Sequence, residues 1–425
     1  MANTFLLSGV VALQLSSAVY AQTIELNQQQ LLHEKTFDFV TNTVAQQYYD
    51  PTLKGLAWRE LAARYKEKLP EKKTPAAFYQ HVNAFLAELN DSHTRVVPKA
   101  VAAQQAQLAV NVGVRGVRLG EHESTIFVRE VVPDSAAAQA GLQEGDIVKT
   151  AGGESALERF QRAFNANEKF IASRRHEASL AAVLRVRSGR SLVLTVEREG
   201  VSDLVSIAPD SGDPPAPVSV EMLGVDVSRI ALRRFRSDVM PTISEALQER
   251  APRGFVLDMR GNDGGDLAVV MSIAERIFTA PTVIAHELTR NGGMTGLFSE
   301  SNERSWVAGG KPGMREEPIA VLIDERCASA CEVFAAALQE SGRARIFGHA
   351  SAGIVAGISI RPIEMPDGGG LNVSRIGILS PSKRVLDNVG VTPDETCTIT
   401  VADAKKKEDC VLARAQKWLA GQIAY

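Results

Sequence analysis

The sequence of 425 residues predicts a multidomain α/β protein. Three regions with different apolar patterns support this prediction. Apolar side chains recur at helical spacing from about residue 26 to 90, strand-like runs follow from about 108 to 206, and strands alternate with helices from about 218 to 394. A chain of this length can form roughly two or three cores, so we expect the three regions to fold as separate domains.

The first 21 residues have the pattern of a secretory signal peptide. An apolar run starts at Phe5, and Val19-Tyr20-Ala21 offers a small-residue cleavage site before Gln22. The run is too short to span a bilayer, and the segment Met1-Ala2-Asn3-Thr4 lacks the Lys or Arg that usually precedes such a run. We expect a mature chain that begins at Gln22, has no membrane span and is periplasmic or secreted.

Composition argues against several classes of partner. The formal net charge is -3, with 47 basic and 50 acidic side chains, which gives no electrostatic basis for binding nucleic acid or an anionic membrane. The seven histidines and four cysteines include no HExxH motif and no zinc-type spacing. We therefore expect no metal and no other cofactor.

The four cysteines fall into two close pairs. Cys397 and Cys410 are thirteen positions apart, and in an exported chain this spacing predicts a loop-closing disulfide. Cys327 and Cys331 flank Ser329, and whether they form a bridge depends on the geometry of the turn between them. The sequence leaves that second pairing open.

The N-terminal region, 22–105, is predicted to be helical. Its clearest helix has Thr74 as N-cap and Pro75 as first residue, and its apolar face continues to Leu89. We interpret that face as core packing. The helix stops at the polar turn Asn90-Asp91-Ser92-His93-Thr94.

Short strands and turns dominate the next region, 106–207. Pro133-Asp134-Ser135 opens a short helix, Ala140-Gly141-Leu142 closes it, and Gly145-Asp146 turns into a strand that ends at Gly152-Gly153. This order resembles a PDZ domain, with residues 191–196 as the last hairpin strand and residues 154–180 as an inserted helical segment.

The resemblance to a PDZ domain implies a way of binding peptides. Such domains hold an extended peptide end by β-augmentation and its carboxylate in a nest of N–H groups. Val112-Gly113-Val114 is the candidate loop for that nest.

A proline-rich linker from Pro209 to Pro217 leads into the predicted α/β core, 218–400, and a C-terminal helical segment, 401–425. Within the core, Ser329 lies between an apolar strand, 319–323, and a helix that ends at Gly342. Backbone N–H groups at such a turn can stabilise a developing oxyanion. The simpler interpretation is that Ser329 only caps the helix.

Further motifs change the balance between these interpretations. The strand 255–258 breaks into a glycine-rich loop that ends at Gly264-Gly265, and Gly390-Val391-Thr392-Pro393-Asp394 follows later. Together with the Asp91–Thr94 turn, the PDZ segment and Ala328-Ser329-Ala330, they resemble the C-terminal processing peptidases over nearly the whole mature chain. That family includes tail-specific proteases, tricorn-core proteases and proteins similar to the interphotoreceptor retinoid-binding protein. The resemblance implies a crotonase-like (ClpP-like) core with a PDZ domain beside it.

The resemblance also implies roles for individual residues. Ser329 matches the nucleophile, and the amides of Ala330 and Gly264, with Gly265 as the near alternative, match the oxyanion hole. Tail-specific proteases use a lysine about 25 residues after the serine, but Ile354 occupies that position here. Isoleucine cannot accept a proton, and we do not expect Lys383 to replace the lysine.

The tricorn-like branch uses a histidine, a neighbouring serine and a downstream carboxylate. These match His93, Ser92 and Asp387, which together with the nucleophile form a Ser/His/acid arrangement. The family pattern usually has Glu at the acid position, so Asp387 is one methylene shorter. Two alternatives stay open: lysine-type relatives also carry an Asp-x-His turn, and Asp387 could simply cap the turn before Asn388. Neither Cys327 nor Cys331 takes the place of the serine.

The resulting prediction is an exported serine endopeptidase that acts on unfolded or C-terminal peptide segments. The rival is a pseudoprotease that binds peptide ends through its PDZ domain without cutting them. A crotonase-type acyl-CoA enzyme would share the fold class, but the predicted export and the PDZ segment argue against it. The sequence predicts neither the physiological substrate, the cleavage preference nor the oligomeric state.

Overall fold

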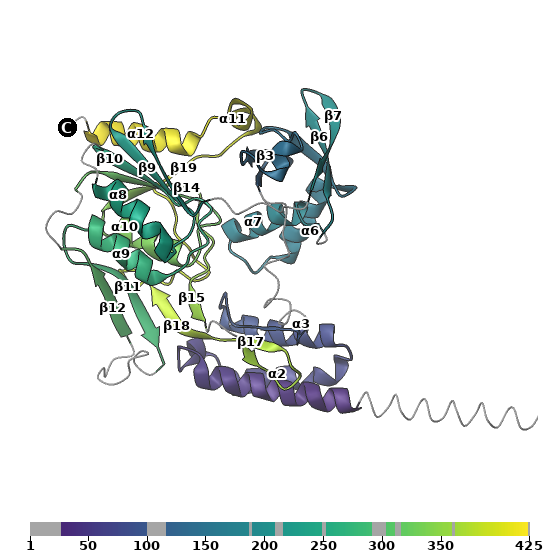
Figure 1. Cartoon of the computed structure of the whole chain (residues 1–425). Coiled ribbons are helices and arrows are strands. Elements are labelled where there is room, and N and C mark those ends of the chain that lie inside the picture. Colours follow the sequence, from purple (N-terminus) through teal and green to yellow (C-terminus); the bar gives the residue numbers. More distant parts are fainter. Residues whose placement is uncertain are drawn as a thin grey trace, which may run out of the picture. The chain divides into compact units, whose positions relative to one another are not determined.

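The computed structural model describes residues 27–99, 116–186, 189–208, 216–248, 252–290, 303–310, 316–358 and 362–423. The predicted signal segment and the loop Val112-Gly113-Val114 lie outside these residues. The chain forms two compact units (Figure 1). The first unit comprises Met1–Gln107, Thr289–Gly296 and Gly357–Gly377, and the second comprises Leu108–Leu288, Leu297–Ala356 and Ile378–Tyr425.

The first unit combines helices with a small sheet. Residues 27–47 are helical, and η1 (Leu53–Gly55), α2 (Trp58–Glu67), η2 (Leu69–Glu71), α3 (Pro75–Leu86) and η3 (Ala87–Leu89) follow. Helix α3 begins as predicted, because the Thr74 hydroxyl accepts a hydrogen bond from Ala77 N–H at 3.2 Å and Pro75 is its first residue.

A later part of the chain completes this unit. Strands β1 (Arg95–Val97), β17 (Gly370–Asn372) and β16 (Ile363–Glu364) form an antiparallel sheet in that order. Leu371 and Val373 pack in the same buried cluster as Phe37 and Phe85. Residues 357–377 fall within the predicted α/β core, 218–400, but the structure groups them with the N-terminal helices.

The PDZ part of the second unit is an antiparallel sheet with helices. Its strand order is β2 (Val117–His122), β3 (Thr125–Val131), β4 (Ile147–Ala151), β6 (Leu192–Arg198) and β7 (Val201–Ile207), and β5 (Glu154–Ser155) pairs with β4. The short helix α5 (Ala136–Gln139) lies where the sequence predicts it. The predicted helical insertion is two helices, α6 (Ala156–Ala166) and α7 (Ala172–Val183).

The remaining core is built on a six-stranded sheet. The order is β19 (Glu395–Thr396), β14 (Ala344–Gly348), β13 (Ile319–Ile323), β10 (Gly254–Asp258), β9 (Val227–Leu232) and β8 (Val218–Leu223). All neighbouring pairs are parallel except β8–β9. Strands β11 (Thr282–Thr289) and β12 (Glu303–Ala308) form a hairpin, and β15 (Ala356–Ile358) and β18 (Ser374–Leu379) contain boundaries between the two units.

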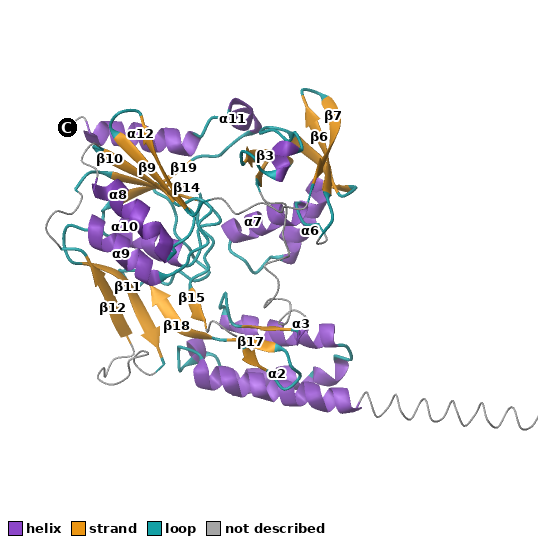
Figure 2. Ribbon diagram, in the orientation of Figure 1, coloured by secondary structure: helices purple, strands orange, loops and turns teal. Residues whose placement is uncertain are grey.

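Helices cover both faces of the six-stranded sheet (Figure 2). One face packs against η4 (Ser237–Val239), α8 (Met240–Gln248), α9 (Leu267–Ile277) and α10 (Ala330–Glu340), and the other against α12 (Cys410–Ile423), which follows α11 (Val401–Lys406). Alternate residues of β13 divide between the faces: Val321 joins the first cluster and Leu322 the second. The multidomain α/β prediction is confirmed.

Both cysteine pairs are bonded. The predicted Cys397–Cys410 bridge joins the end of β19 to the start of α12, with Cα atoms 6.3 Å apart. The pairing that the sequence left open, Cys327–Cys331, is also formed, with Cα atoms 5.4 Å apart. No helix in the described parts of the chain is both long and apolar enough to cross a bilayer.

Candidate active site

Ser329 sits on the sharp turn between β13 and α10. Its backbone has φ 58° and ψ -122°, a strained conformation for a residue with a Cβ. Its N–H donates to Ile354 O at 2.9 Å, and Ala328 N–H donates to Asn262 O at 3.1 Å. The turn is therefore fixed from two sides, while the Ser329 side chain is partly exposed.

The glycine loop lies directly against this turn. A Cβ on Gly264 (φ 100°) would lie 2.7 Å from Ser329 Cβ and 3.2 Å from Ala330 N, and a Cβ on Gly265 (φ 135°) would overlap Phe235 O. Only glycine fits both positions. Gly264 N–H donates to Asn262 Oδ1 at 2.8 Å. Within the described part of the chain, the N–H groups of Gly265 and Ala330 have no acceptor, so both are available to an anion beside Ser329.

A buried carboxylate supports the same turn. Glu332 Oε2 accepts hydrogen bonds from the N–H groups of Ile354 (2.8 Å) and Ser329 (3.1 Å). Its Oε1 accepts from Ser351 Oγ (2.6 Å) and Gly353 N–H (2.7 Å). Burial raises the pKa of Glu332 to about 7, although these four hydrogen bonds oppose the shift. This role of Glu332 was not predicted from the sequence, although the Ser-x-x-Glu spacing of a capping box is a signal for it.

Asp387 lies next to the same backbone segment. Its Oδ1 accepts from Val355 N–H at 3.0 Å, and Asn388 N–H donates to Gly353 O at 2.9 Å. Residues 353–355 thus contact the nucleophile turn on one side and the Asp387 segment on the other. Lys383 is exposed, and its Nζ lies 2.9 Å from Glu303 Oε1.

The histidine turn belongs to the first unit. Ser92 Oγ lies 2.6 Å from His93 Nδ1. Asp91 organises the backbone, because its Oδ1 accepts from the N–H groups of His93 (2.8 Å) and Thr94 (2.7 Å). The candidate residues therefore belong to different units. Ser92 and His93 lie in the first unit, and Ser329, Asp387 and the glycine loop lie in the second.

Two further side chains fix Asp91 from distant parts of the first unit. Ser374 Oγ donates to Asp91 Oδ1 at 2.8 Å, and the Tyr48 hydroxyl donates to Oδ2 at 3.0 Å. Burial and the Asp91 charge raise the pKa of Tyr48 well above its ordinary value. Tyr48 therefore remains a hydrogen-bond donor at all physiological pH values.

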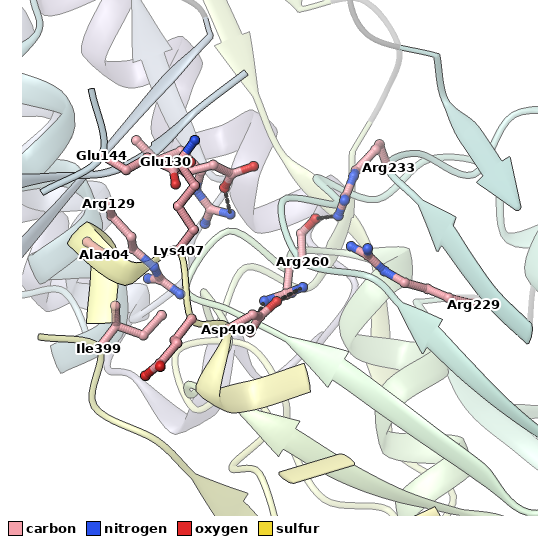
Figure 3. Close-up of a pocket in the computed structure, with 12 residues that line it drawn as sticks. Arg129, Glu130, Glu144, Arg229, Arg233, Arg260, Ile399, Ala404, Lys407 and Asp409 are labelled. Atoms are coloured by element: carbon pink, nitrogen blue, oxygen red, sulfur yellow. Dashed lines mark hydrogen bonds and ion pairs between the residues drawn. The ribbon is translucent and has the colours of Figure 1, made fainter. Parts of the chain in front are cut away.

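A charged cavity in the second unit is lined by residues of strands β2, β3 and β9, by Glu144, by Arg233 and Arg260 just after β9 and β10, and by side chains between residues 399 and 409 (Figure 3). Its arginines have internal carboxylate partners: Arg260 bonds Asp258 and Asp409, and Arg118 of the PDZ part bonds Asp324. Figure 3 shows Arg260 and Asp409 joined in this way. Because the carboxylates balance these cations, we assign the cavity no ligand.

Asp324 connects this cavity to the nucleophile turn. Its buried carboxylate accepts from the N–H groups of Gly261 (2.8 Å) and Arg326 (3.1 Å), at the starts of the glycine loop and the nucleophile turn. Burial alone would raise the pKa of Asp324, but Arg118 and the Gly261 hydrogen bond hold it far below its ordinary value. A PDZ residue thus balances the charge that orders both loops.

No group of three or more His, Cys, Asp or Glu side chains suited to a metal occurs among the described residues.

Comparison with known families agrees with this geometry. Peptidase family S41 matches residues 226–397, the tricorn protease C1 domain matches 32–87, and the PDZ domain matches 95–163. Together with the relatives described below, these matches support a C-terminal processing peptidase with a PDZ domain. The predicted resemblance is therefore confirmed, including the PDZ domain.

Individual relatives of this peptidase cover most of its length. It is 27% identical over 362 residues to a carboxyl-terminal-processing protease of Picosynechococcus sp., covering 83% of this chain and 80% of the relative. A protease with the same description from Synechocystis sp. is 24% identical over 393 residues, covering 90% and 85%.

Solved structures show the same fold. The photosystem II D1 C-terminal processing protease has a TM-score of 0.55 at 21% identity, covering 86% of this chain and 93% of that one. Mature CPAF has a TM-score of 0.64 at 13% identity, covering 93% and 98%. At these identities, the likeness concerns the fold alone.

Proposed function

We propose that this peptidase is an exported endopeptidase that cuts unfolded or C-terminal peptide segments, with Ser329 as nucleophile and His93 as general base. The observation that carries the proposal is the strained Ser329 turn, with the available N–H groups of Gly265 and Ala330 beside it. Because Gly264 N–H is already bonded to Asn262, Gly265 is the better candidate for the second oxyanion donor.

The proposed reaction is acyl transfer. Ser329 Oγ attacks the substrate carbonyl while His93 takes its proton, and the same imidazole then gives that proton to the leaving amine. Ser92 Oγ engages Nδ1 of His93, and in this proposal the proton of Ser329 is exchanged with Nε2. Asp387 supplies the carboxylate of the arrangement.

Substrate capture and compartment are part of the same proposal. Strand β2 is an edge strand of the PDZ sheet, so an extended peptide can pair with it, with its carboxylate at the predicted Val112–Val114 loop. The apolar N-terminal segment and the pairing of all four cysteines support export to an oxidising compartment. Ile354 at the lysine position is the observation that favours the rival, a pseudoprotease that only binds peptides.

The test measures turnover and binding side by side. Wild type, Ser329→Ala, His93→Ala and the control Lys383→Ala are assayed with an unfolded fluorogenic substrate, and peptide binding is followed by fluorescence anisotropy. We expect both site variants to lose at least about 10³-fold in turnover while binding is retained, and Lys383→Ala to match wild type because its ammonium pairs with Glu303.

Two outcomes contradict the proposal. If the His93→Ala variant hydrolyses the substrate at the wild-type rate, His93 is not the general base. A wild type as inert as Ser329→Ala, with equal peptide binding, would establish the pseudoprotease.

A further inference from the structure

The Cys327–Cys331 bridge encloses the nucleophile. Cys327 lies two residues before Ser329 and Cys331 two residues after it, so the disulfide closes a small ring around the turn. Neither cysteine has exposed surface. The described residues contain no free thiol, and one of the two disulfide bridges lies at the proposed reaction centre.

The ring contacts the segments that shape the site. Cys327 N–H donates to Asp324 O at 2.9 Å, and Cys327 O accepts from Ala352 N–H at 2.9 Å, next to the segment that binds Glu332. Cys331 Sγ lies 3.8 Å from Met259 O, at the end of β10 where the glycine loop begins. The bridge therefore lies between the nucleophile turn, the glycine loop and residues 351–354.

The strained backbone of Ser329 makes the position of the Cys327–Cys331 bridge important. A non-glycine residue at φ 58° persists only where its surroundings over-determine the backbone. A covalent link from Cys327 to Cys331 removes the conformations into which such a turn would relax. The directions of Ser329 Oγ and Ala330 N–H both depend on this one turn.

We infer that the Cys327–Cys331 disulfide is a positioning element of the peptidase. It holds Ser329 Oγ and the Ala330 N–H in the geometry that acyl transfer requires. The inference rests on the proposed function, and it goes beyond it by making turnover depend on the bridge. The bridge acts through Ser329 and touches no substrate atom.

The second disulfide provides a matched control. Cys397–Cys410 links β19 to α12, and both cysteines pack with the cluster on the sheet face opposite α10. Removing it also takes one covalent link from the second unit, but it leaves the contacts of the nucleophile turn in place.

The experiment compares wild type with the full-length double variants Cys327→Ala/Cys331→Ala and Cys397→Ala/Cys410→Ala. The readouts are the labelling rate of Ser329 by a fluorophosphonate probe, kcat and KM for an unfolded substrate, and the thermal unfolding midpoint. We expect the first variant to lose roughly tenfold or more in labelling rate and kcat with an unchanged KM, since small misplacement of a reacting group is costly. The control should keep both rates within about twofold of wild type even where its midpoint falls.

A second experiment tests the inference if the Cys327→Ala/Cys331→Ala variant does not fold. The folded control variant, which retains only Cys327–Cys331, is treated with a water-soluble phosphine. The S–S bond accepts two electrons from phosphorus and two protons, giving two thiols, and the phosphine leaves as its oxide with an oxygen from water. Once alkylation and mass mapping show that the bridge is open, the labelling rate should fall by roughly the same tenfold or more.

The outcomes separate the two proposals. If the wild type is labelled, and the labelling rate is the same after the Cys327–Cys331 bridge is removed or reduced, the inference is overturned and the proposed function stands. Equal losses in both double variants also overturn it, because the effect would then be general destabilisation. A wild type that is neither labelled nor active overturns the proposed function, and the inference falls with it.

Discussion

The nucleophile turn and the histidine turn are held by contacts of different range. Glu332, which binds Ser329 N–H, is three residues away in the chain, and the Cys327–Cys331 bridge spans a separation of four. Asp91, which orders the histidine turn, is held by Tyr48 and Ser374, at separations of 43 and 283 residues. The nucleophile turn thus combines nearby supports in the chain with its contacts to Asn262 and Ile354, whereas the side chains that hold Asp91 both come from distant parts of its unit.

This difference implies different responses to mutation. The nucleophile turn concentrates its support in a few buried groups, so the loss of one of them should change the reaction strongly. The Asp91 carboxylate of the histidine turn accepts from two distant side chains as well as from two N–H groups of the turn, so either side-chain donor can be lost with a smaller effect. The following three predictions are in order of expected size: the first two compare the turns directly, and the third tests a buried carboxyl group with the same direction of pKa shift as Glu332.

Replacing Glu332 by glutamine should have the largest effect. The amide nitrogen of Glu332→Gln would face N–H groups that now donate to a carboxylate oxygen, either those of Ser329 and Ile354 or that of Gly353. We expect kcat to fall at least about 10²-fold, as for loss of an oxyanion-hole donor. Glu340→Gln, near the other end of α10, should stay within about twofold. A Glu332→Gln enzyme with wild-type kcat would show that the carboxylate does not position Ser329.

Removing the Ser374 hydroxyl should have a moderate effect. Ser374→Ala deletes one donor to Asp91 Oδ1, which still accepts from two backbone N–H groups. Loss of such a hydrogen bond costs about 1 kcal/mol, so we expect a decrease of about fivefold in kcat. Ser341→Ala, at the C-terminal end of α10, is the matched control. A loss as large as that of Glu332→Gln would mean that both turns are equally fragile.

The pH dependence of stability should show the smallest effect. Burial raises the pKa of Glu177, on α7 beside Arg326, to about 7, as it does for Glu332. The pKa of such a carboxyl group is higher in the folded state than in the unfolded state. Its contribution to stability is fully present at pH values below the unfolded-state pKa, and it is lost as the pH rises to the folded-state pKa of about 7. The free energy of unfolding should therefore fall between about pH 4.5 and 7. The full shift corresponds to about 3 kcal/mol, but because the Glu177 side chain is 31% exposed and screened by solvent, we expect roughly 1 kcal/mol.

Urea denaturation at several pH values measures this slope. Glu177→Gln should have a flatter profile than wild type, because the amide does not titrate. An identical slope in the two proteins would show that Glu177 titrates equally in the folded and unfolded states.

Local signals account for what the sequence predicted correctly. The apolar strand 319–323, the start of α3 at Pro75 and the short PDZ helix after Ser135 all depend on neighbouring residues, and each lies where it was predicted. Paired cysteines likewise indicated the Cys397–Cys410 bridge.

Contacts between distant residues account for what the sequence did not predict. Strand β17 is three residues long and follows a run of glycines, so nothing in its composition indicates β1 as its partner. The Arg118–Asp324 pair joins residues 206 positions apart, and either side chain alone is an ordinary surface charge in the sequence. Side-chain charge has no periodic signature, and pairing over such distances follows from the fold.

The late return of residues 357–377 to the first unit has a consequence for how the chain is made. Ribosomes release the N-terminal helices first, but Met365, Leu371 and Val373 complete the core around them. Among the described strands, the partner of β1 is β17, which emerges later. A nascent chain shorter than about 357 residues therefore exposes an unfinished apolar face. The histidine turn also lacks its Ser374 contact until residue 374 has been synthesised. Translation thus places the completion of this turn after the synthesis of Ser329, so a truncated product that ends between residues 330 and 356 carries the nucleophile without a finished histidine turn.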